Sequence, residues 1–223
     1  MKVRVRKKFN IFEGIDDYYV GFYENIPHPC PGGVVGKVMN RFDNKIQVPI
    51  VVDDEEIEKN GCGPCVYDGD HENVLESAIF MTNEFFDEFR NNKILSCALW
   101  HEIGHFHTFR YFENKHDENG SATTIRGEYI KRGEILPEEK GADLFALYYT
   151  SKERMVEFYN YEIKKHRNKE ITGLFSEEIK ELKEINEMTI RELCSRKRYI
   201  SELDCSKENI LKELCKVCGI KGN

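Results

Sequence analysis

Two histidines and a glutamate form the pattern H-E-x-x-H, with His101, Glu102 and His105 as its members. Residues four apart lie on the same face of a helix, so both imidazoles can bind one zinc ion. The glutamate between them then faces the fourth coordination position, where a water molecule binds. The pattern therefore predicts a zinc site with a carboxylate directed at its water.

The segment that carries this pattern is apolar on most sides, as expected of a buried helix. Histidines in such a helix need polar partners, and one metal ion supplies a partner for both; a histidine pair satisfied within the core is the alternative. Gly104 costs a helix about 1 kcal/mol relative to alanine, which suggests that a substrate strand or a sheet backbone packs closely there. The apolar members are Ile94, Leu95, Cys97, Ala98, Leu99, Trp100, Ile103 and Phe106.

A second helix is predicted over residues 137–147, because proline opens it and two carboxylates follow. Glu139 and Asp143 are four apart and share one face of this helix. Glu139 can be the third zinc ligand, and Asp143 can accept the second N–H of a ligand histidine and fix its tautomer. The alternative is an ordinary acidic helix start, although small Ala142 and apolar Phe145 favour a buried face.

Together, H-E-x-x-H and E-x-x-A-D-x-F-A resemble the gluzincin zinc metallopeptidases with minigluzincin cores, such as the ImmA/IrrE-type peptidases and the soluble relatives of HtpX-type peptidases. Residues 78–86 and 94–105 resemble the edge strand, short helix and active-site helix of that core. The resemblance covers roughly positions 75 to 150. It implies zinc held by His101, His105 and Glu139, with Glu102 as the general base.

Peptidases of this kind usually add a donor for the oxyanion that develops on the scissile carbonyl. Tyr148, Tyr149, His107 and Arg110 lie nearby in the sequence, and the sequence does not choose among them. His107 is a poor metal ligand because it lies about 200° around the helix from His105.

The composition predicts a globular rather than a disordered protein, since 40% of the 223 residues are hydrophobic and 33% are charged. The net charge of −7 makes nucleic acid an unlikely main partner. No run approaches the roughly 20 apolar residues of a membrane helix, and no apolar segment follows the basic N-terminus as in a signal peptide. We expect a cytoplasmic protein that acts on a protein or peptide substrate.

Two C-x-x-C pairs, Cys62 with Cys65 and Cys215 with Cys218, predict a second and structural metal site if they meet. About 150 residues separate the pairs, so nothing local brings them together. Redox catalysis by the first pair is disfavoured, because acidic neighbours oppose a thiolate.

Short β-rich runs with turns between them predict a small, twisted and mostly antiparallel sheet, packed beside the H-E-x-x-H helix in an α+β fold. Residues 79–81 are predicted as an edge strand for substrate addition, or alternatively as a core strand. The polar connection 112–136 is read as a loop, with a hairpin over 123–136 that either caps the site or is solvated. The runs are residues 3–5, 18–23, 34–39 and 46–52.

The chain is predicted to hold a metallopeptidase domain at residues 1–150, with its catalytic core at 75–150, and a helical extension at 151–223 packed on that core. One helix begins at Ser176 and another follows Ser206. Their apolar stripes predict core contacts or contacts in a homo-oligomer.

Three functions fit these features: a zinc peptidase, a zinc-binding regulatory or protein-binding module with weak or lost activity, and another zinc hydrolase such as an amidase. Glu102 favours an enzyme, because metal binding alone does not require it.

Overall fold

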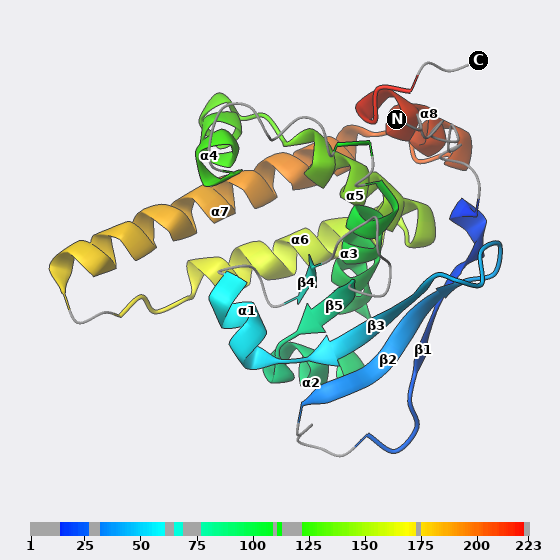
Figure 1. Ribbon diagram of the computed structural model, residues 1–223. Helices are drawn as coiled ribbons and strands as arrows, with labels where there is room; N and C mark the ends of the chain where they lie inside the picture. The colour runs from blue at the N-terminus through cyan, green and yellow to red at the C-terminus, as the bar shows by residue number, and fades with distance from the viewer. Residues whose placement is uncertain are drawn as a thin grey trace, which may run out of the picture. The chain divides into compact units, whose positions relative to one another are not determined.

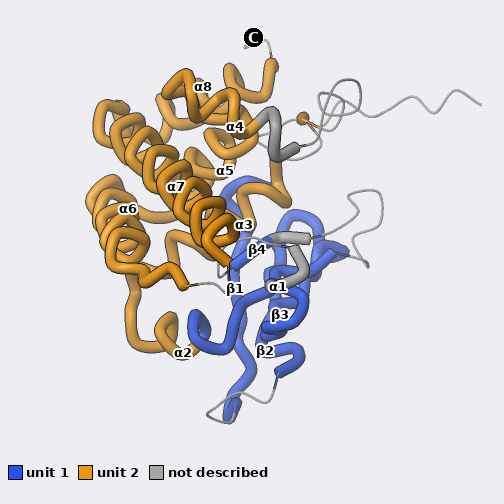
Figure 2. The backbone as a smooth tube through the Cα atoms, turned by 90° about the vertical axis from the view of Figure 1, so that its left-hand side faces the viewer, with its two compact units in different colours: residues 1–86 blue, residues 87–223 orange. Residues whose placement is uncertain are grey.

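The computed structural model of the protein describes residues 14–26, 32–60, 65–68, 77–108, 111–112, 122–172 and 175–220 (Figure 1). The chain divides into two compact units, residues 1–86 and 87–223, which Figure 2 shows in different colours. The division falls within a helix, and the predicted domain boundary at residue 150 stays a prediction. The predicted strand at residues 3–5 lies outside the described residues.

The first unit contains one five-stranded sheet in the order β1-β2-β3-β5-β4. All neighbouring strands pair antiparallel except β3 and β5, which are parallel. The α+β class with a mostly antiparallel sheet is therefore confirmed. Its elements are η1 (Ile15–Asp17), β1 (Tyr18–Phe22), β2 (Gly33–Asn40), β3 (Gln47–Val52), α1 (Asp54–Asn60), β4 (Cys65–Asp68) and β5 (Ala78–Met81), followed by the start of α2 (Asn83–Asn91).

Alternating burial explains why the β3 segment forms a strand. Val48, Ile50 and Val52 are almost fully buried, whereas Gln47 and Val51 between and beside them are more exposed. Successive side chains of a strand point to opposite faces, so this alternation places one apolar face of β3 in the core of the sheet.

The predicted edge position of β5 is wrong. Ile79 is paired with Ile50 of β3, and Phe80 is paired with Val66 of β4, so both hydrogen-bonding edges of β5 are occupied. Strand β4 was not predicted from the sequence, because its four residues are flanked by turn-forming glycines, a proline and aspartates. A substrate strand therefore cannot add to β5, and the core-strand alternative is confirmed.

The second unit is helical. The predicted helices over 137–147, from Ser176 and after Ser206 are confirmed, and no helix among the described residues is long and apolar enough to span a bilayer. Helix α5 packs against α3 and α8, and α7 packs against α6, so the residues after 151 belong to the same unit as the H-E-x-x-H helix. The elements are η3 (Lys93–Leu95), α3 (Ser96–Thr108), α4 (Ala122–Arg132), α5 (Pro137–Tyr149), α6 (Lys152–Arg167), α7 (Ser176–Glu202) and α8 (Lys207–Val217).

Helix α4 replaces the hairpin predicted over residues 123–136. Gly133 has a φ of 71° and ends the helix, with its N–H donating to Ile130 and the N–H of Glu134 donating to Tyr129. This pair of hydrogen bonds is the Schellman C-terminal motif, in which glycine is favoured. Gly127, the other glycine read as a turn, lies inside α4 and is buried.

Candidate metal centre

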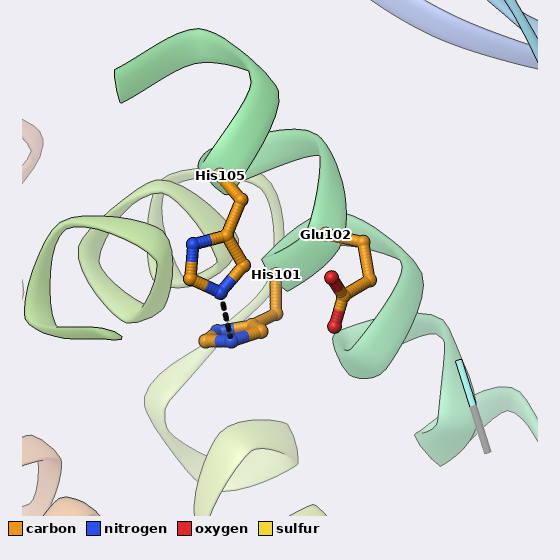
Figure 3. A group of neighbouring side chains, drawn as sticks. All are labelled: His101, Glu102 and His105. Atoms are coloured by element: carbon orange, nitrogen blue, oxygen red, sulfur yellow. Dashed lines mark hydrogen bonds between the residues drawn. The ribbon is translucent and has the colours of Figure 1, made fainter. Parts of the chain in front are cut away.

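Helix α3 carries the two histidines on one face, as their spacing predicts. The Nε2 atoms of His101 and His105 lie 3.0 Å apart, and the two rings are nearly perpendicular. Figure 3 shows the two imidazoles turned toward each other, with the Glu102 carboxylate beside them. His101 is buried, whereas Glu102 and His105 are partly exposed, so solvent reaches one side of the group.

His101, Glu102 and His105 each offer one ligand atom, and these atoms lie within 4.8 Å of one another. The group could therefore hold a metal ion. Two imidazole nitrogens and a carboxylate are donors that several divalent transition metals accept, zinc among them.

Glu139 of α5 brings a second carboxylate to the same histidines. Its Oε2 lies 3.3 Å from Nε2 of His101, and its Oε1 lies 3.7 Å from Nε2 of His105. Ligands placed about 2.05 Å from a tetrahedral zinc are separated by roughly 3.3 Å. The structure therefore brings the Glu139 carboxylate beside both histidines, with a different oxygen nearest each ring.

Gly104 allows α3 and α5 to approach closely enough for this convergence. A Cβ at Gly104 would lie 2.8 Å from both Cα and the carbonyl oxygen of Ala142, and 2.9 Å from Cβ of Phe145. The neighbour that needs the small residue is thus the backbone of α5. The expectation of a substrate strand or a sheet backbone at this position is wrong.

We predict that Gly104→Ala destabilises the protein, although alanine favours a helix over glycine by about 1 kcal/mol. The added methyl group overlaps backbone atoms, and overpacking of this kind costs about 1–3 kcal/mol. Urea unfolding measures the change. Gly127→Ala is the matched control, because among the described residues a Cβ there meets only Met188, at an ordinary 3.4 Å, and it should stabilise. Equal stabilisation by both substitutions would contradict the close packing of α3 on α5.

Asp143, one turn after Glu139, makes the predicted contact with a ligand histidine. Its Oδ1 lies 2.9 Å from Nδ1 of His101, and its side chain is completely buried. The hydroxyl of Tyr159 on α6 donates to the same oxygen at 2.5 Å. A carboxylate that accepts from Nδ1–H leaves Nε2 of His101 as the nitrogen with a lone pair for a metal.

Arg196 of α7 is a site residue that the sequence reading missed. Its guanidinium donates to both oxygens of Asp143, at 2.9 Å from Nε and 2.6 Å from Nη2, and to Oε2 of Glu139 at 2.8 Å from Nη1. Nη2 also lies 3.0 and 3.2 Å from the two ring nitrogens of His101. The signal that could have found it is a charged residue on the buried stripe formed by Leu193 and Ile200.

A second arginine pairs with α7 near this site. Arg126 of α4 donates to Oε2 of Glu192, at 2.9 Å from Nε and 2.8 Å from Nη2. The Arg126 side chain is 48% exposed, whereas that of Glu192 is 4% exposed. Burial lowers the pKa of Arg126, but the negative charges of Glu192 and Glu139 raise it more, so α4 lies within the electrostatic range of the site.

The two imidazoles have opposite pKa shifts. Burial and Arg196 lower the pKa of His101, but hydrogen bonds to Asp143 and Glu139 raise it more, to about 9. Burial and the neighbouring charge of His101 lower the pKa of His105 to about 4. Burial by itself raises the pKa of Glu139, but the charge of Arg196 holds it well below the usual range. Near neutral pH the metal-free group thus has a positively charged His101 and a neutral His105, and a metal ion must displace the Nε2 proton of His101 to bind there.

We predict that metal-free protein shows one imidazole titrating near pH 9 and one near pH 4. The pKa of His101 in the folded protein exceeds the ordinary histidine pKa of 6.5, so its contribution to stability is complete below about pH 6.5 and is lost as the pH rises through 9. Long-range ¹⁵N NMR of the rings measures both titrations, and a bound metal ion should abolish them. Two rings that both titrate near 6.5 would contradict this electrostatic arrangement.

Tyr148 and Tyr149, two of the suggested oxyanion donors, lie at the far end of α5. They follow Glu139 by nine and ten residues, which is roughly 14 Å along a helix, and Tyr148 faces the opposite side. Tyr149 stacks on Trp100, with ring centroids 4.0 Å apart, and Lys207 lies over the ring of Tyr148, so the oxyanion role of either tyrosine stays a prediction. His107 is buried in α3, and Arg110 lies outside the described residues.

The two C-x-x-C pairs remain a prediction. Cys62 lies outside the described residues, and Cys65 is buried in β4. Cys215 and Cys218 are buried at the end of α8, and burial raises the pKa of the Cys215 thiol, which disfavours the thiolate form that metals bind. Within the described ranges, His101, Glu102 and His105 form the group of ligand-type side chains that could hold a metal ion.

Comparisons with known proteins do not assign this chain to a family: no protein-family model, no curated protein and no solved structure matches it. Any function must therefore be argued from the site itself.

Proposed function

We propose that the protein is a zinc-dependent metallopeptidase that hydrolyses peptide bonds in a protein or peptide substrate. The observation that carries the proposal is the convergence of Nε2 of His101, Nε2 of His105 and the Glu139 carboxylate, with Glu102 beside them. Two imidazoles and one carboxylate are the protein ligands that catalytic zinc sites use when a fourth position is kept for water or substrate. Zinc is the metal that this donor set favours.

When bound, zinc lowers the pKa of its water toward about 7 and polarises the scissile carbonyl. Glu102 then takes the proton of the attacking water and delivers it to the leaving amine, as general base and general acid in turn. Its partly exposed carboxylate lies on the same helix as the two histidine ligands, so one rigid element positions base and ligands together.

Asp143 and His101 support the same reaction. Asp143 holds the Nδ1 proton of His101, which keeps the Nε2 lone pair directed at the ligand group. The carboxylate of Asp143 is itself held in its charged form: burial raises its pKa, but Arg196 and the hydrogen bond from His101 lower it to about 2. This acceptor therefore stays deprotonated throughout the neutral range.

The proposal includes a cytoplasmic location, supported by cysteine chemistry. Cys97, Cys194 and Cys205 are free thiols, and free thiols are usual in reducing compartments.

The test of the proposed function is casein cleavage by zinc-loaded protein, compared with the Glu102→Gln variant at equal zinc content. Loss of cleavage in the variant supports the peptidase. Equal inertness of both proteins would favour the regulatory or protein-binding module instead. Cleavage of small amides without cleavage of peptides would favour an amidase.

A further inference from the structure

We infer that Arg196 is a positioning residue of the metal site: it leaves one oxygen of Glu139 for the metal and fixes the orientation of His101 through Asp143. The inference rests on the metal site of the proposed function, but it concerns a residue from the C-terminal helices. Arg196 lies 53 residues beyond Asp143, on α7. Its side chain is 10% exposed, so its contacts are shielded from water.

The contact with Glu139 selects which carboxylate oxygen is available. Nη1 of Arg196 lies 2.8 Å from Oε2, and this hydrogen bond uses electron density that a metal ligand would donate. Oε1, which lies 3.7 Å from Nε2 of His105, has no such donor from Arg196. One-oxygen coordination by Glu139 keeps the ligand count at three and leaves the fourth position open for the reaction.

The contact between Arg196 and Asp143 fixes the plane of the Asp143 carboxylate. Nε and Nη2 of Arg196 reach separate oxygens of Asp143, the two-point geometry that a guanidinium forms with a carboxylate. Tyr159 donates to Oδ1 of the same carboxylate and lies beneath the guanidinium, with its ring centroid 5.4 Å from Cζ of Arg196. Asp143 is thus held in one orientation, in which Oδ1 meets Nδ1 of His101.

A comparison with Arg126 separates positioning from simple charge. Arg126 also forms an ion pair with α7, but both of its nitrogens reach a single oxygen of Glu192, and among the described residues its effect on Glu139 is a longer-range charge interaction rather than a hydrogen bond. Arg126 is also half exposed. It is therefore a matched control for any effect of losing an arginine from the α7 interface.

The experiment measures zinc affinity by competition with a fluorescent chelator, for the wild-type, Arg196→Lys, Arg196→Met and Arg126→Met proteins. Arg196→Lys is decisive, because lysine keeps the buried charge beside Asp143 but cannot make the two-point contact, whereas Arg196→Met leaves that carboxylate without its cation. We expect zinc to dissociate about 10- to 100-fold more readily from the Arg196 variants, as for other residues that orient metal ligands. Arg126→Met removes only a longer-range charge from Glu139, so its zinc affinity should change much less than that of the Arg196 variants.

A second readout follows the histidine itself. In zinc-loaded wild type, the Nδ1 proton of His101 should resonate far downfield, because a carboxylate accepts it. This signal should shift upfield or broaden in Arg196→Lys and stay in place in Arg126→Met. Arg196→Lys protein with wild-type zinc affinity and an unmoved His101 proton would overturn the inference.

These readouts use no substrate, so they are independent of peptidase activity. A protein that cleaves no peptide, yet loses zinc affinity on Arg196→Lys, would support the positioning role and contradict only the proposed function. A protein that cleaves casein, while Arg196→Lys binds zinc normally, would contradict only the positioning role.

Discussion

Glu102→Gln is expected to lower kcat/KM for peptide cleavage by about 10²- to 10⁴-fold, the contribution typical of a positioned general base. Glutamine has nearly the same shape as glutamate but cannot take a proton from water. Zinc should stay bound at one ion per chain, because His101, His105 and Glu139 supply the ligand atoms. A fluorogenic peptide measures the rate, and atomic emission measures the zinc content.

The matched control for this variant is Glu138→Gln. Glu138 is in the first turn of α5, next to Glu139, and its charge acts on His105, so this variant removes a nearby carboxylate charge without removing the proposed base. It should keep most of the activity. If Glu102→Gln instead loses its zinc, Glu102 is a ligand, and the assignment of its role as base is contradicted.

Asp143→Asn is expected to lower the free energy of unfolding by about 3–5 kcal/mol, the cost of breaking a buried ion pair from one side. The aspartate accepts from His101, Tyr159 and Arg196, all of which donate to it. An amide replaces one acceptor with a donor and leaves the Arg196 charge buried without its counter-ion. Chemical denaturation of the metal-free proteins measures the difference.

Glu192→Gln provides the comparison, because it removes the other buried carboxylate partner of an arginine at the α7 interface. Because the Arg126 side chain is half exposed, water can hydrate it after its partner is removed. We therefore expect the free energy of unfolding to fall by only about 1 kcal/mol. If Glu192→Gln lowered the free energy of unfolding as much as Asp143→Asn, burial of the carboxylate alone would explain the destabilisation, and the contacts of Asp143 with His101 and Arg196 would not.

Acid titration gives a further readout of Asp143. Its pKa falls from 3.8 to about 2 on folding, so its stabilisation is complete above about pH 4 and is lost as the pH falls toward 2. Asp143→Asn protein should lack this part of the acid dependence.

Local spacing made the convergence of the candidate ligand residues predictable from the sequence. His101 and His105 are four apart, as are Glu139 and Asp143, and helix geometry alone places each pair on one face. The helical start at Pro137 was also readable, since proline and acidic residues are favoured in a first turn. Patterns of this kind depend only on residues within one or two turns of the same helix.

One physical reason explains why the sequence did not predict the role of Arg196, strand β4 or helix α4: each depends on contacts with residues far along the chain. The role of Arg196 depends on a tertiary contact across 53 residues, and no local pattern reports it. Strand β4 is stabilised by its pairing with β5, whereas its own flanks favour turns. In α4, Gly127 resembled a turn residue, but packing against Met188 of α7 outweighs its low helix propensity.

The close packing at Gly104 was predicted correctly from the sequence, but the element that packs against it was predicted wrongly. A glycine within an apolar helix indicated close packing, and close packing is present. Which element packs there depends on the order of helices in space, which no spacing along the chain reveals. The packing of the sheet beside the H-E-x-x-H helix likewise stays a prediction.

Anomalous diffraction at the zinc edge, from crystals of zinc-loaded protein, tests the proposed ligand set. We expect one strong peak about 2.0–2.2 Å from Nε2 of His101, Nε2 of His105 and one oxygen of Glu139, with the Glu102 carboxylate outside the coordination sphere. A peak coordinated by Glu102 in place of Glu139, or no peak beside the two histidines, would contradict it.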